Sequence, residues 1–309
     1  MAFLNNFYTV FIQVLILFIF MGFGFIGEKK RLISEEGSRV MSDIILYFVT
    51  PCLIINSLNI EFNSDKLSGL LICLVAFLII QILSAVLVTL LFRNKDSGTN
   101  KVLRFAVVFS NVGYMGIPLQ KVVLGDEGVF YGSVCVAVFN IFVWTYGIIC
   151  MSGDKKQMSA KKLILNPGII AVTIGLILFA FSLKLPTPIS SAIGSMASLN
   201  TPLAMMVIGF NLSRSNLLSA LKDKRVYIVS FLRLILIPII ALFVLLAFGL
   251  RGTLLVSIII AASAPVAAAT TVFSIKYEAD TELSVKLVAF STLLSIITIS
   301  AIVALAQMF

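Results

Sequence analysis

The stretch that decides the fold is residues 110–118, which read SNVGYMGIP inside an otherwise apolar run at 105–120. Pro118 has no backbone N–H and disfavours helix in the residue before it, and the two glycines and Asn111 weaken a helix further. Backbone freed from a helix is tolerated at membrane depth only where it lines a cavity or is buried in protein. The stretch therefore predicts an unwound binding segment, and a simple proline kink is the alternative.

The composition places this stretch in a membrane. The chain has 309 residues, of which 60% are hydrophobic and 12% charged, and its mean hydropathy is +1.11. So much apolar surface cannot be hidden in one globular core, because a large part of any folded surface stays wet. A lipid bilayer is the remaining solvent, which excludes soluble enzymes, nucleic-acid binders and disulfide scaffolds. We read the net charge of +9 as loop charge against an anionic membrane face.

Ten apolar runs recur along the chain, separated by short polar loops. A spanning helix needs roughly 20 apolar residues, and most of the runs reach that length. The expected fold is therefore all-α, an integral membrane protein with ten transmembrane helices. The runs lie at residues 7–27, 40–58, 67–92, 105–120, 129–151, 167–183, 189–212, 226–250, 253–275 and 287–309.

The distribution of Lys and Arg over the loops predicts the orientation. The loops after the first, third, fifth and seventh runs hold four each and the loop after the ninth holds two, whereas the even loops hold one each. Since positive loops mark the cytoplasmic side, we expect the odd loops in the cytoplasm and both termini outside. Residues 1–6 carry no Lys or Arg, so the first run is read as a retained helix and not as a signal peptide. We expect a multi-pass protein of the cell membrane.

The whole chain, residues 1–309, is expected to form one transporter unit built from two copies. The first five-helix repeat covers 7–151, a short cytoplasmic linker covers 152–166, and the second repeat covers 167–309. Because each copy has an odd number of spans, the second must enter the membrane inverted. Inverted repeats are typical of secondary transporters, whose sites lie near the bilayer midplane.

Two sequence matches support the repeat. The Thr-Pro pair that ends at Pro51 recurs as the pair that ends at Pro202, and Glu127 recurs as Glu278, both at an offset of 151. The ninth run also carries a helix breaker, Pro265, as the fourth does. We therefore expect the fourth and ninth helices to be broken and to cross.

At these residues the sequence resembles the auxin efflux carrier family, which includes plant auxin exporters and bacterial permeases for malate and malonate. The resemblance implies a fold similar to that of the bile-acid sodium symporters, with a scaffold and a transport domain. It also implies transport of small carboxylates. Two features differ from the plant members: the linker 152–166 is short, and Thr270 stands where they have a second proline. The residues that carry the resemblance are 111–119, 249–252, Arg233 with Pro238, Ala264 with Pro265, and Lys276 with Tyr277.

The candidate substrate site is the crossing of the two broken helices. Half-helix N-termini offer orphan N–H groups and the positive end of the helix dipole, which suit a carboxylate. The resemblance implies that Asn111 and the backbone around Pro118 and Pro265 contact that carboxylate. The expected substrate-binding residues are Asn111, Val112, Gly113, Tyr114, Gly116, Ser263, Ala264 and Val266, and the expected helix-breaking residues are Pro51, Pro118, Pro202 and Pro265.

Arg233 is the only full charge well inside an apolar run. Such a residue is expensive in a membrane and functional by default, so we assign it to charge balance at the site, acting indirectly. The alternatives are snorkelling to the cytoplasmic interface and a salt bridge between helices.

Several absences bound the function. The chain has no histidine, its four cysteines show no pairing pattern, and it has no clustered acids. We expect no catalytic residue, no metal site, no cofactor and no enzyme activity. No acid falls in the middle of a run, which favours a facilitator, an exchanger or a proton travelling on the substrate. A sodium-coupled symporter of the bile-acid type is the alternative function. The sequence leaves open whether the protein forms a homodimer.

Overall fold

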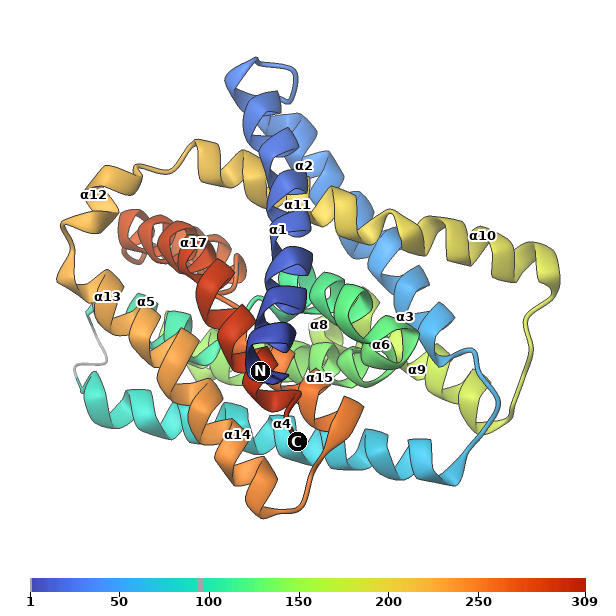
Figure 1. Cartoon of the computed structure of the whole chain (residues 1–309). Coiled ribbons are helices and arrows are strands. Elements are labelled where there is room, and N and C mark those ends of the chain that lie inside the picture. The colour runs from blue at the N-terminus through green and yellow to red at the C-terminus, as the bar shows by residue number, and fades with distance from the viewer. Residues whose placement is uncertain (1, 94–96) are drawn as a thin grey trace.

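In a computed structural model of the chain, the structure describes residues 2–93 and 97–309, and these residues are helical almost throughout (Figure 1). Within these ranges the β-structure consists of one isolated antiparallel bridge. Each of the ten apolar runs coincides with helical segments. Lys95, one of the expected loop cations, lies outside the described residues.

The helices of the first half cover most of residues 2–157. They are α1 (Ala2–Lys29), α2 (Glu35–Ile44), η1 (Ile45–Val49), α3 (Thr50–Leu58), α4 (Ser64–Leu91), α5 (Gly98–Val108), η2 (Val112–Gly116), α6 (Ile117–Phe142), η3 (Val143–Gly147), α7 (Ile148–Ser152) and η4 (Lys155–Gln157).

The remaining helices begin with α8, which lies inside the linker 152–166. They are α8 (Ala160–Ile164), α9 (Pro167–Ala180), α10 (Thr187–Ser198), α11 (Asn200–Ser213), α12 (Leu217–Leu221), α13 (Lys224–Phe231), η5 (Leu232–Leu236), α14 (Ile237–Ala247), α15 (Gly252–Ser263), α16 (Ala269–Lys276) and α17 (Thr281–Ala306).

Seven helical stretches in the described residues are long and apolar enough to cross a membrane, so the chain is a multi-pass membrane protein. The longest, Val112–Ser152, has 41 residues and bends at Gly125, whose φ of 69° no ordinary helical residue adopts. Pro167–Ala180 and Gly252–Ser263 are apolar but shorter.

At three prolines inside these stretches the helix continues and does not end. Pro51, Pro118 and Pro238 each come two residues after a π-helical segment (η1, η2 and η5). A proline removes one N–H and its ring crowds the carbonyl four residues back, and a wider π turn relieves that crowding. Pro51 and Pro118, expected to break their helices, therefore lie inside continuous helical structure, and Pro202 lies in the first turn of α11.

The most buried helix is α15, which packs between α6, α14 and α17. Its residues from Leu255 to Ser263 are all buried, so this helix ends deep inside the molecule.

The helices α1 and α11 approach each other until their backbones touch. A Cβ atom added at Gly24 would lie 2.0 Å from the carbonyl oxygen of Met206, and one added at Gly209 would lie 1.9 Å from that of Met21. Small residues permit such close packing of membrane helices, where van der Waals contact drives association.

We expect Gly24→Ala to destabilise the protein by about 1–3 kcal/mol, because its methyl group must push α11 away from α1. The thermal midpoint of the purified protein in detergent measures this change. Gly22→Ala, on the same helix with nothing within 4 Å of the added Cβ, is the matched control and should leave the midpoint unchanged. Equal effects of the two changes would refute the close contact.

Candidate functional site

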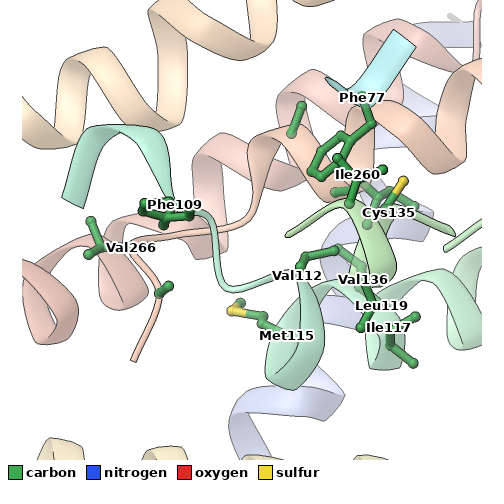
Figure 2. Packing of buried hydrophobic residues seen from close by; sticks show 14 of the residues in the cluster. Phe77, Phe109, Val112, Met115, Ile117, Leu119, Cys135, Val136, Ile260 and Val266 are labelled. Atoms are coloured by element: carbon green, nitrogen blue, oxygen red, sulfur yellow. The ribbon is translucent and has the colours of Figure 1, made fainter. Parts of the chain in front are cut away.

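Two helix breaks meet inside the molecule. The first separates α5 from η2 at residues 109–111, and the second separates α15 from α16 at 264–268. The N–H of Asn111 donates to the carbonyl of Pro265 at 2.7 Å, and the N–H of Ala267 donates to the carbonyl of Phe109 at 2.9 Å. Figure 2 shows Phe109 and Val266 on the two irregular segments, with Val112 and Met115 in the turn that follows. The breaks thus pair as a short antiparallel bridge.

The two breaks have different local causes. Pro265 disfavours helix at Ala264, which is extended with a ψ of 146°. The first break contains no proline, and Pro118 lies several residues beyond it. Here Asn111 leaves the helical region (ψ 55°), and its carbonyl accepts from the N–H groups of Met115 and Gly116, both at 3.0 Å, to start the next helix.

Arg233 binds the ends of both interrupted helices. It is 1% exposed, and its Nη1 donates to the carbonyls of Val107 (3.0 Å) and Val108 (3.2 Å) at the end of α5. Its Nη2 donates to the carbonyl of Ala262 at the end of α15. A cation suits these places because the C-terminal end of a helix is negative and its last carbonyls lack partners. Its side chain is thus buried against carbonyl groups, and it forms no salt bridge in the described residues.

The two helices that begin after the breaks keep free donors. The N–H groups of Gly113 and Tyr114 at the start of η2, and of Ala268 and Ala269 at the start of α16, donate to no backbone or side-chain acceptor in the described residues. By contrast, the carbonyl groups at the C-terminal ends of α5 and α15, just before the breaks, accept from Arg233. At the crossing, backbone N–H donors are therefore free, whereas these carbonyl acceptors are bound.

A cavity of about 520 Å³ lies beside these donors. Its wall includes Asn111, Tyr114, Ala268 and Ala269, and the side-chain amide of Asn111 forms no hydrogen bond with described protein groups. The rest of the wall is largely apolar, with Thr292 of α17 among its few hydroxyls. The cavity can hold a small molecule with one polar end at the crossing.

Not every expected site residue reaches this cavity. Asn111 and Tyr114 line it, and Gly113 is half-buried between them. The others are buried and do not line it: the hydroxyl of Ser263 donates to the carbonyl of Ile259, and the N–H of Val266 donates to Ser291 Oγ at 3.1 Å. The buried residues outside the cavity wall are Val112, Gly116, Ser263, Ala264 and Val266.

Pro51 and Pro202 lie outside the cavity wall, next to another contact between the two halves of the chain. The amide of Asn200 donates to Thr50 Oγ1 at 3.1 Å and so joins the two Thr-Pro pairs, on α3 and α11. Neither proline therefore contacts a molecule bound in the cavity.

The sequence did not point to several residues of the wall. Ser42, Arg214, Ala268, Ala269 and Thr292 all line the cavity. Small polar residues recur on the buried face of α17, and that stripe is the one sequence feature that could have indicated Thr292. Arg214 counted only as a loop cation, because it follows the end of α11.

We expect Arg233→Met to lower the free energy of unfolding by about 3 kcal/mol or more, because it leaves buried carbonyls of two helices without a donor. The thermal midpoint in detergent measures this loss. Arg225→Met is the control, since Arg225 is half exposed and pairs with Asp223 at 2.6 Å near the start of α13. An Arg233→Met protein with the midpoint of the parent would contradict the capping role.

The comparisons with known proteins agree with a membrane transporter. A family model described as "membrane transport protein" matches residues 9–161 and again residues 155–303. An uncharacterized transporter of Methanothermobacter thermautotrophicus is 26% identical over 97% of this chain and 98% of its own length. Another, of Methanocaldococcus jannaschii, is 24% identical over 93% of this chain and 96% of its own length. Because the family model covers nearly the whole chain, the chain belongs to the membrane transport protein family, the family of the auxin efflux carriers.

Proposed function

We propose that this transporter is a secondary carrier of small organic anions, carboxylates such as malate, malonate or auxin-like acids, which bind at the crossing of the two broken helices. The observation that carries the proposal is the pair of helix N-termini with free N–H groups beside one cavity. Helix N-termini bind anions because their N–H groups and dipoles point the same way.

The charges around the cavity favour the same ligand. Among its described wall residues none is an Asp or a Glu, and the one cation, Arg214, pairs with Glu35 at 2.8 Å. Arg233 neutralises the negative helix ends behind the crossing. A carboxylate entering here therefore meets free N–H donors and no acidic wall residue, while its apolar body contacts Val207, Ile208 and Val288.

Ten spans in two inverted repeats account for the helices. The 41-residue stretch divides into two spans at Gly125, and the segments before and after each break together make one span. With α9 counted as a span, each half of the chain then has five. The two successive matches to one family model support the internal repeat.

Contacts between loops support the alternation of sides. On the side of the odd loops, Ser213 Oγ donates to Glu28 at 2.8 Å and Thr99 Oγ1 donates to Asp280 at 2.9 Å. On the side of the even loops, Lys184 pairs with Glu61 at 2.7 Å and holds the pKa of that carboxyl below its usual range. With the odd loops in the cytoplasm, as their charge predicts, both termini lie outside.

The cavity then opens toward the cytoplasm, because Arg214 and Ser215 of an odd loop stand in its wall. The opposite side of the crossing is closed. Gln120 Nε2 donates to the carbonyl and hydroxyl of Ser257 at 2.9 and 3.0 Å, and so ties α6 to α15. Gly132 makes room for this link, since a Cβ there would lie 1.9 Å from Gln120 Oε1. Transport would require this contact between Gln120 and Ser257 to open as the cytoplasmic cavity closes.

We expect Asn111→Ala to weaken carboxylate binding about tenfold or more, because a hydrogen bond to a charged group contributes roughly 1.5–3 kcal/mol. The measurement is the concentration of malate, malonate or indole acetate that half-maximally raises the thermal midpoint of the purified protein. Asn56→Ala, on α3 and outside the cavity wall, is the control and should bind like the parent.

Unchanged binding in Asn111→Ala would show that the carboxylate does not bind at the crossing. Uptake into vesicles with and without sodium completes the test: sodium-independent uptake is expected, and strict dependence on sodium would favour the bile-acid type of symport instead.

A further inference from the structure

The sequence Gly-Leu-Arg-Gly at 249–252 carries the family resemblance, yet it lies far from the cavity. It connects α14 to α15, and Gly249 and Gly252 take positive φ values of 80° and 61°, which favour glycine. Arg251 Nη1 donates to the carbonyls of Leu246 (3.1 Å) and Leu250 (2.7 Å). Its guanidinium therefore covers the C-terminal end of α14.

Arg251 keeps donors that the protein does not use. Of the cations on the even-loop side, Lys121 and Lys184 each pair with a carboxylate, and Lys66 lies over the ring of Phe130. Within the described residues, Arg251 has no carboxylate within 4 Å, and its Nε and Nη2 donate to no acceptor. Arg251 is exposed, and its guanidinium lies over the ring of Phe309, a contact that uses no N–H group, so these donors are free for an external anion.

An apolar groove begins beside this cation. It has a volume of about 700 Å³ and lies between α4 and α14. Val75 and Ile79 form part of one wall and Val244 part of the other, and Ser84 is the one residue with a polar side chain among its described lining residues. Leu250 lines the groove, and its carbonyl is the one bonded to Arg251 at 2.7 Å. The guanidinium thus stands at the mouth of the groove.

The length of the groove suits one lipid tail. Its wall on α4 runs from Leu71 to Leu87, about 24 Å at the helical rise of 1.5 Å per residue. That is more than half of the roughly 30 Å hydrocarbon core, so it exceeds the depth of one leaflet. Both helices belong to membrane-spanning stretches, where lipid tails are the solvent.

We propose that the groove and Arg251 together bind an anionic glycerophospholipid. Its phosphate accepts from the free N–H groups of Arg251, and one acyl chain lies between α4 and α14. Guanidinium groups bind phosphate through paired, charge-assisted hydrogen bonds, so the headgroup charge is the basis of selectivity.

Native mass spectrometry of the purified protein with equal amounts of phosphatidylglycerol and phosphatidylcholine of the same acyl chains tests this site. We expect the parent to retain phosphatidylglycerol in preference. Arg251→Gln should reduce that preference about tenfold, as loss of a charge-assisted hydrogen bond predicts. Val75→Trp, which fills the groove and leaves Arg251 in place, should also reduce retention.

Two matched controls separate the site from general effects. Lys66→Gln removes a cation of the same membrane side, and Val86→Trp enlarges an α4 residue outside the groove that is 52% exposed, against 53% for Val75. Both should retain the lipid like the parent. Equal retention of the two lipids by the parent, or unchanged retention in Val75→Trp, would overturn the proposal. So would displacement of the lipid by glycerol phosphate alone at matched concentration, since it would show a site for a small anion.

Discussion

The helices α5 and α15 end inside the molecule, and the carbonyl groups of both ends are bound by one guanidinium, that of Arg233. An unpaired carbonyl in a membrane costs several kcal/mol, so neither helix could stop there without a donor. Arg104 and Arg251 do the same at the ends of α4 and α14, where they donate to the carbonyls of Phe92 and of Leu246 and Leu250. Arginine serves this purpose because its five N–H groups can reach carbonyls of two chains at once.

The helix N-termini that follow the two breaks have no such partner for their N–H groups among the described residues. In the first turns of η2 and α16, the N–H groups of Tyr114 and Ala269 stay unpaired within the part of the chain that the structure describes, and both residues line the cavity. The N–H of Asn111 donates to the carbonyl of Pro265 at 2.7 Å, and this hydrogen bond holds the starts of the two helices close to each other. A site made of backbone donors carries no full charge of its own, so an anion can bind there and also leave. This is what the proposed carrier needs.

Much of the fold followed from hydropathy, because a bilayer imposes the length and polarity of each span on the sequence. The break at Ala264 was also predictable, since Pro265 acts on the residue directly before it. The sequence suggested an unwound segment at residues 110–118, whereas the break lies at 109–111. Pro118 suggested the later position, but a π turn accommodates this proline within a continuous helix. Arg233 was recognised as unusual, but its carbonyl partners on α5 and α15 are set by tertiary packing, which no spacing in one chain reveals. Arg214, in the cavity wall, was counted only among the loop charges for the same reason.

The central claim is that a carboxylate binds at the crossing, in a cavity open to the cytoplasm. The most direct test is alkylation of Ala268→Cys in a variant without the four native cysteines, because Ala268 offers an unpaired N–H and lines the cavity. A membrane-impermeant maleimide should label this cysteine from the cytoplasmic side, and the transported carboxylate should slow the labelling in a saturable way. Labelling from the outside alone, or a rate that no tested carboxylate changes, would contradict the account.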